Sequence, residues 1–301
     1  MSRPPTFTPP PGTRAHVLRT SRGDFATLVG EPAPGPVRGT ALLLPGFTGS
    51  KEDFIALHGA LSAAGYRSVA VDGRGQYETA GPEKDERPYA QGELARDVLA
   101  QAAALGPGKV HLLGHSLGGL IARAAVIADP APFASLTLMA SGPAAVAPAQ
   151  RQRVDMLRDA LAAFDMAQVW EAMQALEAAE DVVDVRGDEE ALRQRWLRNS
   201  PAQLIATGRQ LCTEPDRVDE LAAVAPPVHV LSGERDEAWP VPWLDEMARR
   251  LKAERTVIAG AEHSPNTDRP AETAAALTAF WDRHPASDLS ADRSRPGPAP
   301  S

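Results

Sequence analysis

Residues 109–123 read KVHLLGHSLGGLIAR. The stretch opens as a short apolar run typical of a buried strand and reaches the motif Gly114-His-Ser-Leu-Gly118. After the motif, apolar residues recur at helical spacing from Leu120 to Ile127. A strand, a sharp turn and a helix are the setting in which Gly-x-Ser-x-Gly forms a nucleophile elbow, with its serine on a strained turn. The sequence therefore predicts that Ser116 is a nucleophile.

Strands and helices alternate along most of the chain. We expect strands at 16–20, 24–29, 39–44, 66–71, 135–140, 228–231 and 255–258, besides the strand before Gly114. Helices are expected at 51–64, 90–105, 241–252 and 270–283, besides the helix after Ser116. This alternation demands a mostly parallel sheet covered by helices on both faces. Ligands bind beyond the carboxyl ends of such strands, where Phe47, Asp72, Ser116 and Ser141 fall.

The pattern changes between residues 144 and 212. Apolar residues recur there at helical spacing in four groups, and no strand signal appears. We expect an all-helical insertion at 144–212 in an α/β core made of residues 14–143 and 213–284. The Pro-rich segment 1–13 and the polar tail 285–301 are predicted to be disordered and dispensable for activity.

Composition limits the class of partner. The net charge of −8 gives no reason to expect nucleic acid or an acidic membrane as a partner. A single cysteine, Cys212, excludes an internal disulfide and a multi-cysteine metal site, and we predict no metal and no cofactor. There is no apolar run long enough to span a membrane, and the N-terminus lacks the apolar core of a signal peptide. We therefore expect a cytoplasmic protein, of undetermined oligomeric state.

A serine hydroxyl needs a base to take its proton, and the base needs an acid to orient it. The last two expected strands end in loops that carry Asp236 and His263. The other histidines lie in expected strands or a helix, within the elbow, or at the C-terminal end, namely His16, His58, His111, His115, His229 and His284. We therefore predict His263 as the general base. Asp236 is predicted as the orienting acid, with Glu234 and Glu237 as the neighbouring alternatives.

Acyl transfer also needs hydrogen-bond donors for the oxyanion of the tetrahedral intermediate. The backbone N–H of Leu117, directly after the serine, is one predicted donor. The backbone N–H of Phe47 is the second, because Gly46 permits an unusual turn after the strand that ends at Leu44. An ordinary turn at Pro45-Gly46 is the alternative.

The chain resembles the α/β-hydrolase superfamily, in its lid-bearing hydrolase and esterase branch. The resemblance spans residues 14–284 and rests on five motifs, LPGFTGS from Leu44, DGRG from Asp72, GHSLGG from Gly114, GERD from Gly233 and GAEH from Gly260. It implies an α/β-hydrolase fold, with a mainly parallel central sheet of about eight strands and the helical insertion as a cap. The DGRG loop resembles a scaffold element of the family, and we assign it no catalytic role.

One position departs from the family pattern. The oxyanion loop of the family often contains His-Gly, where this chain has Pro45-Gly46. Proline offers neither an N–H nor a side-chain donor. We therefore expect altered rigidity of this loop rather than loss of activity.

The serine narrows the chemistry that the resemblance implies. Epoxide hydrolases and haloalkane dehalogenases of the superfamily normally use an aspartate nucleophile, so Ser116 argues against both. We expect hydrolysis of a small or medium apolar carboxylic ester or thioester through an acyl-serine. A triad-bearing ligand receptor or signalling protein with very slow turnover, an acyltransferase, and a hydrolase of lactones, peptides or carbon–carbon bonds are alternatives. Trp170, Trp196 and Trp239 are candidates for the substrate pocket, with core packing as the alternative for residues at helical spacing.

Overall fold

One eight-stranded sheet forms the centre of the computed structural model, which describes residues 2–179 and 188–286. The strands are β1 (Thr13–Thr20), β2 (Gly23–Gly30), β3 (Gly39–Leu44), β4 (Tyr66–Val71), β5 (Val110–His115), β6 (Phe133–Met139), β7 (Val228–Gly233) and β8 (Glu254–Ile258). Their order across the sheet is β1-β2-β4-β3-β5-β6-β7-β8. The pairs β1–β2 and β2–β4 are antiparallel and all the others are parallel. The predicted fold class is confirmed.

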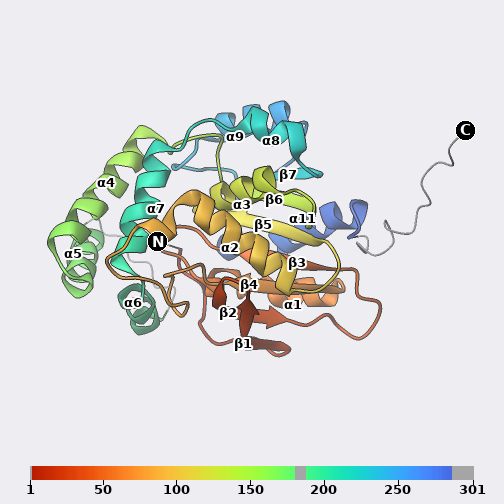
Figure 1. Cartoon of the computed structure of the whole chain (residues 1–301), viewed down its shortest axis with the longest axis horizontal. Helices are drawn as coiled ribbons and strands as arrows, with labels where there is room; N and C mark the ends of the chain where they lie inside the picture. The colour runs from red at the N-terminus through yellow and green to blue at the C-terminus, as the bar shows by residue number, and fades with distance from the viewer. Residues whose placement is uncertain (1, 180–187, 287–301) are drawn as a thin grey trace, which may run out of the picture.

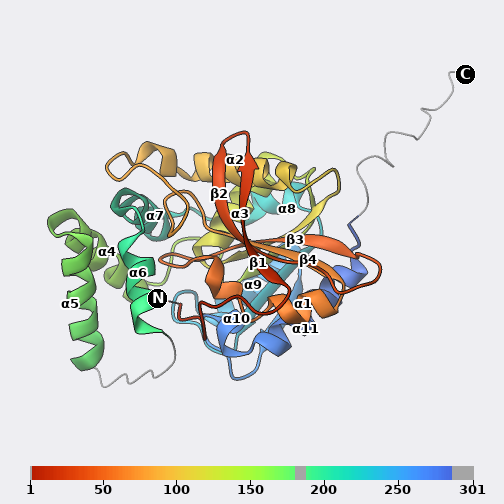
Figure 2. The ribbon, with the colours of Figure 1, turned by 90° about the horizontal axis from the view of Figure 1, so that it is seen from below.

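Helices cover both faces of this sheet (Figures 1 and 2). One face packs against α1 (His58–Ala63) and α11 (Pro270–Arg283). The other face packs against α2 (Gln91–Ala104), α3 (Leu117–Ala128), α8 (Val218–Val224) and α9 (Val241–Leu251). Neighbouring residues of a strand point to opposite faces, and accordingly Leu43 belongs to the first core and Leu42 to the second.

The short helices of the structure differ from the sequence prediction. The helix expected at 51–64 is divided into the short helix η1 (Lys51–Phe54) and α1. Both the backbone N–H and the ammonium of Lys51 bind the carboxylate of Asp72, at 2.7 and 2.8 Å. This buried contact fixes the first turn independently of the helix that follows. The short helices η2 (Arg87–Tyr89), α8 and α10 (Pro265–Asp268) were not predicted, because so few residues carry no clear period.

Between β6 and α8, four described helices lie together beside the sheet (Figures 1 and 2). They are α4 (Pro148–Ala163), α5 (Met166–Ala179), α6 (Glu189–Leu197) and α7 (Pro201–Thr213). These helices share a core of buried residues, Leu161, Val169, Trp170, Leu192, Trp196 and Leu204. Residues 180–187 of the predicted insertion, and residues 287–301 of the predicted tail, lie outside the described residues.

The N-terminal residues 2–12 differ from the prediction of a disordered segment. Pro4 is buried, and Phe7 packs against the core of the four helices. At the end of the segment, the carbonyl oxygen of Gly12 accepts a hydrogen bond from the N–H of Glu31 at 3.3 Å. A proline-rich chain has less conformational entropy to lose than an ordinary one. Composition alone therefore does not distinguish a disordered segment from one that docks on the folded protein.

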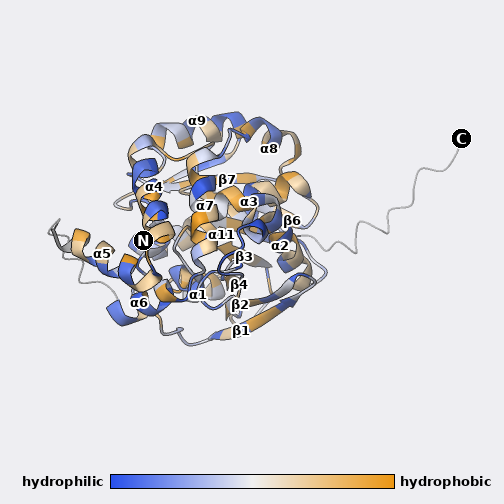
Figure 3. Cartoon of the chain, turned by 60° about the vertical axis from the view of Figure 1, so that its left-hand side comes forward, coloured by the Kyte–Doolittle hydropathy of each residue, from blue (hydrophilic) through white to orange (hydrophobic). Residues whose placement is uncertain are grey.

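The outer helices bury their apolar residues and expose their polar ones. Figure 3 shows hydrophilic residues along the outer turns of α8 and α9. In α9, Leu244 and Met247 are buried, whereas Glu246 and Arg249 form an ion pair at the surface. Within residues 2–179 and 188–286, the helices are all too short or too polar to cross a membrane.

Four histidines are buried within the fold. In each of them one ring nitrogen bonds an oxygen atom, and the other has no hydrogen-bond partner in the described part of the chain. The pairs are His58 with Ser68, His111 with Ser135, His115 with the backbone of His263, and His229 with Thr256. Because burial disfavours the charged imidazolium, it lowers the pKa of all four histidines to about 4.

We expect the protein to lose stability as the pH falls from about 6.5 to about 4. Over this interval the unfolded histidines bind protons and the folded ones do not, which favours the unfolded chain by roughly 1.4 kcal/mol per histidine and pH unit. Burial raises the pKa of Asp72, and this single group acts in the opposite direction. Urea unfolding should therefore give a lower midpoint at about pH 5 than at about pH 7. An equal or higher midpoint at the lower pH would contradict this account.

Candidate active site

Ser116 lies on the turn between β5 and α3. Its backbone has φ 54° and ψ −119°, a conformation that residues other than glycine rarely adopt. The N–H of Ser116 donates to the carbonyl oxygen of Met139 on β6, and its carbonyl oxygen accepts from the N–H of Gly119, both at 2.9 Å. Bonds to the next strand and to the following helix therefore hold the strained turn in place.

The glycines on either side of Ser116 leave no room for a side chain. A Cβ atom on Gly118 would lie 2.5 Å from the carbonyl oxygen of Leu44. A Cβ atom on Gly114 would lie 2.3 Å from the carbonyl oxygen of Gly118. The approach at Gly118 brings the first turn of α3 against the end of β3 and its loop, and the approach at Gly114 brings the same turn against β5.

Ser116, His263 and Asp236 form a chain of hydrogen bonds. The distance from Ser116 Oγ to His263 Nε2 is 3.1 Å. On the other side of the ring, His263 Nδ1 lies 3.0 Å from both carboxylate oxygens of Asp236. A carboxylate accepts only, which assigns the proton to Nδ1 and leaves Nε2 to accept from the serine hydroxyl. The three residues come from the ends of β5, β7 and β8 and meet at the edge where ligands bind in such sheets.

The three neighbouring acids have different environments. The side chain of Asp236 is fully buried, and its Oδ1 accepts from two backbone N–H groups of the following turn at 2.8 and 3.0 Å. Glu234 accepts instead from a backbone N–H at 3.0 Å, at an exposed site. Glu237 pairs with Arg153 at 3.0 Å on the surface. Of these three carboxylates, Asp236 is the one that faces His263.

Two rings support His263 from the sides. The imidazole of His115 donates through Nε2 to the carbonyl oxygen of His263 at 2.8 Å. The plane of the Trp239 indole is inclined by 29° to the His263 ring, with 6.2 Å between the ring centroids. His115 therefore holds the backbone of the loop that carries His263. Because Nε2 of His115 makes this bond, it is not available to the serine hydroxyl.

The loop after β3 approaches Ser116 at Gly46. A Cβ atom on Gly46 would lie 3.2 Å from the Cβ of Ser116. The carbonyl oxygen of Gly46 accepts two hydrogen bonds, from the N–H of Gly49 at 3.1 Å and from Nε2 of Gln76 at 3.0 Å. In a planar trans peptide the C=O and N–H bonds point in opposite directions, so these two bonds also set the direction of the Phe47 N–H. The N–H of Leu117 is the first of α3, directly after Ser116, where backbone N–H groups have no partner within the helix.

Gln76 is a site residue that the sequence analysis missed. Its side-chain oxygen accepts from the N–H of Gly73 at 2.9 Å, while its amide nitrogen binds Gly46. The residue follows the DGRG motif directly, but nothing in the sequence indicates that its side chain turns toward the loop after β3.

A cavity of about 240 Å³ opens over Ser116 and His263. Residues 46–48 form one wall, and Val146, Gln150 and Leu211 line it from the region of the four helices. Ser2, from the N-terminal segment, also lines the cavity. This volume is below the range of roughly 300–1,000 Å³ that is usual for drug-sized ligands, and Gln150, Ala238 and His263 also line an adjoining hollow of about 570 Å³.

The three tryptophans expected in the pocket do not line this cavity. Trp170 and Trp196 lie in the core of the four helices, where the indole N–H of Trp196 donates to the carbonyl oxygen of Met166 at 2.7 Å. Trp239 is fully buried beside His263 and donates to the carbonyl oxygen of Ala144 at 2.8 Å. Large rings with satisfied N–H groups are typical of packed interiors, which was the alternative for residues at helical spacing.

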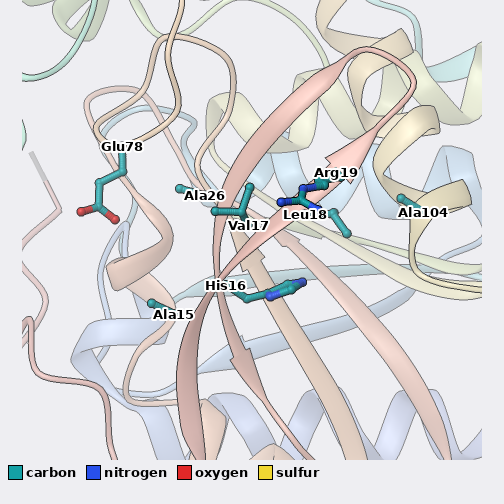
Figure 4. Close-up of a pocket in the computed structure, with 8 residues that line it drawn as sticks. All are labelled: Ala15, His16, Val17, Leu18, Arg19, Ala26, Glu78 and Ala104. Atoms are coloured by element: carbon teal, nitrogen blue, oxygen red, sulfur yellow. The ribbon is translucent and has the colours of Figure 1, made fainter.

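Two further hollows are present in the surface. One of about 570 Å³ adjoins the exposed side of His263, and its rim carries the ion pairs Arg153–Glu237 and Arg235–Glu262. The other, of about 690 Å³, is an open groove beside β1, where His16 to Arg19 and Glu78 line it (Figure 4). Its lining residues include none of the groups that surround Ser116.

Sequence comparisons relate the chain to known hydrolases. Residues 41–276 match the sequence profile of the alpha/beta hydrolase family. The chain is 32% identical over 220 residues to a pimeloyl-[acyl-carrier protein] methyl ester esterase from Aeromonas hydrophila, a match that covers 69% of this chain and 82% of that protein. A shorter match, 39% identical over 106 residues, joins 35% of this chain to 39% of a provisionally named carbamate hydrolase from Variovorax paradoxus. That match spans less than half of either protein.

Solved structures share the fold. A thermophilic esterase from Thermogutta terrifontis superposes with a TM-score of 0.70 at 22% identity, covering 90% of this chain and 99% of that one. At this level of identity the likeness establishes the arrangement of strands and helices alone.

We expect Gly118→Ala to lower the free energy of unfolding by at least about 1–3 kcal/mol, because the added Cβ meets backbone carbonyl oxygens. The same clash should remove most of the activity. Gly92→Ala is the matched control, since Gly92 lies in α2 with open space around it and should fold as well as the parent. Thermal melting compares the two. Equal melting temperatures for both variants would show that the turn and the β3 loop are not in close contact.

Proposed function

This chain is an enzyme of the alpha/beta hydrolase family, and from that premise we propose that it is a serine hydrolase of small or medium carboxylic esters or thioesters. The observation that carries the proposal is the chain of hydrogen bonds from Ser116 Oγ through His263 to Asp236. The methyl ester esterase among its relatives supports ester cleavage. The cavity of about 240 Å³ supports a small acyl or alcohol group.

In the first half of the reaction, Ser116 Oγ attacks the carbonyl carbon of the ester while Nε2 of His263 takes the hydroxyl proton. The carbonyl oxygen becomes an oxyanion, which accepts hydrogen bonds from the N–H groups of Phe47 and Leu117. The imidazolium gains stability from the carboxylate of Asp236. When the tetrahedral intermediate collapses, the carbon–oxygen bond to the alcohol breaks, His263 donates its proton to the alcohol, and the acyl group remains on Ser116.

In the second half, water repeats the sequence. His263 takes a proton from a water molecule, whose oxygen attacks the acyl carbon and forms a second oxyanion between the same two N–H groups. Collapse of this intermediate releases the carboxylic acid and returns the proton to Ser116 Oγ. The reaction consumes one water and produces one acid and one alcohol, and the protein ends in its initial state.

Ser116→Ala tests the nucleophile. We expect wild-type protein to react once with a fluorophosphonate at Ser116 and to hydrolyse p-nitrophenyl esters, and the variant to do neither. Labelling is followed by intact mass, and its position by peptide mapping. If the Ser116→Ala variant hydrolyses these esters at the wild-type rate, the reaction does not pass through an acyl-enzyme at Ser116.

Asp236→Asn tests the orienting acid. We expect kcat to fall by at least about a hundredfold with little change in KM, because an amide at this position favours the wrong tautomer of His263. Glu237→Gln is the control, since it neutralises the next acidic residue along the chain at an exposed site. If Glu237→Gln lowers kcat as much as Asp236→Asn does, Asp236 is not the orienting acid.

Gln76→Ala tests the support of the oxyanion donor. We expect kcat to fall about tenfold to a hundredfold at unchanged KM, less than the loss of an oxyanion donor itself would cost. Gln76→Glu keeps the size of the side chain but cannot donate to Gly46 when ionised, so it should lower kcat similarly. Recovery of kcat by Gln76→Glu at neutral pH would show that Gln76 acts only by filling space.

A further inference from the structure

The N-terminal residues 2–7, which we call the strap, lie in contact with the active-site cavity and with helix α6. Ser2 lines the cavity together with Phe47, Ser116 and His263. The carbonyl oxygen of Ser2 accepts a hydrogen bond from the guanidinium of Arg195 on α6. The strap thus contacts two parts of the molecule that are remote from it in sequence.

Arg195 forms the central contacts of this arrangement. Its side chain is fully buried and forms an ion pair at 2.8 Å with the equally buried carboxylate of Asp53 in η1. The guanidinium also lies 5.7 Å from the centre of the Phe7 ring, within range of a cation–π contact. A single buried cation therefore joins the strap, the four helices and the segment after the β3 loop.

Asp53 extends the connection to the loop that borders Ser116. Its Oδ2 accepts a hydrogen bond from the N–H of Ser50 at 3.3 Å. Its backbone carbonyl oxygen accepts from Nδ2 of Asn266, which follows His263 closely in the chain, at 2.6 Å. Contacts of Asp53 thus connect Arg195 to the loop after β3 and to the segment that follows His263.

Phe7 fixes the other end of the strap. Its ring packs against the core of the four helices, which contains Trp170 and Trp196. Between this anchor and Ser2, Pro4 is buried and Pro5 restricts the backbone further. The position of Ser2 at the cavity is thus determined by contacts outside the cavity.

The hydroxyl of Ser2 is shielded from water and has no hydrogen-bond partner within the described residues. An atom buried in this way does not face the cavity, so what Ser2 presents there is a steric boundary.

We propose that the strap is a wall of the substrate cavity and limits the length of the ester that Ser116 accepts. This inference rests on the proposed function and adds a specificity-determining element to it. With Ser2 in its wall, the cavity of about 240 Å³ admits a short acyl or alcohol group, and displacement of the strap opens it to longer ones.

Phe7→Ala in the full chain removes the anchor without touching the cavity. We expect the ratio of kcat/KM for p-nitrophenyl octanoate to that for the butyrate to rise about tenfold, the order of discrimination that a few methylene groups provide. Thr8→Ala is the control, since Thr8 is exposed directly beside Phe7 and should leave the ratio unchanged. An unchanged ratio in a folded Phe7→Ala variant would overturn the proposal.

Ser2→Phe gives a test of the opposite sign and does not depend on the stability of the anchor. A larger side chain at the cavity should lower kcat/KM for the octanoate at least tenfold more than for the butyrate. Should this substitution affect both esters equally or not at all, Ser2 does not border the acyl group or the alcohol.

Fluorophosphonates of increasing chain length separate the two levels of the proposal. If the wild-type protein is not labelled at Ser116 by any of them, the proposed function fails and the strap has no substrate to select. If all three proteins are labelled with the same dependence on chain length, the function stands and the strap is not a specificity element. Labelling rates that shift toward long chains in Phe7→Ala and toward short chains in Ser2→Phe support it.

Discussion

The close contact between the Ser116 turn and the loop after β3 is the constraint on which the site depends. A left-handed serine is intrinsically unfavourable, by an amount on the order of 1–3 kcal/mol. The surrounding sheet holds it there through the bond to Met139, and the absence of a side chain at Gly118 allows the two backbones to meet. The same contact brings Gly46 beside Ser116, so one local geometry serves both the nucleophile and its neighbouring N–H donors.

The loop after β4 supports this contact from the side. The carboxylate of Asp72 binds the backbone and the ammonium of Lys51, and Gln76 binds the carbonyl oxygen of Gly46. Burial alone would lower the pKa of Lys51, but the charges of Asp72 and Glu52 raise it above its ordinary value. The side chains of Asp72 and Gln76 thus fix the backbone at the two ends of the segment 46–51. The DGRG segment, for which the resemblance implied a scaffold role, also has an indirect influence on the candidate oxyanion donor.

Much of this architecture could be predicted from local patterns. The alternation of strands and helices and the order of Ser116, Asp236 and His263 are written in short runs of sequence, and the structure brings these three side chains within hydrogen-bonding distance. What could not be predicted depends on pairs that are remote in the chain. The bond from Gln76 to Gly46 and the contact of Ser2 with Arg195 have no periodic signal, and the proline-rich strap matched the composition of a disordered segment. The burial of Trp239 likewise depends on Gly142, where a Cβ atom would lie 2.0 Å from the indole ring.

The strap has a consequence for the order of folding. The bond between Ser2 and Arg195 joins residues that are 193 positions apart in the chain, and the helix that holds Arg195 must first pack on the core that presents Asp53. Contacts of such high sequence separation are costly in loop-closure entropy until intervening structure has formed. Docking of the strap is therefore expected to be a late step. Before it, the molecule would have its sheet and its serine, histidine and aspartate in place, while one side of the cavity is still open to solvent.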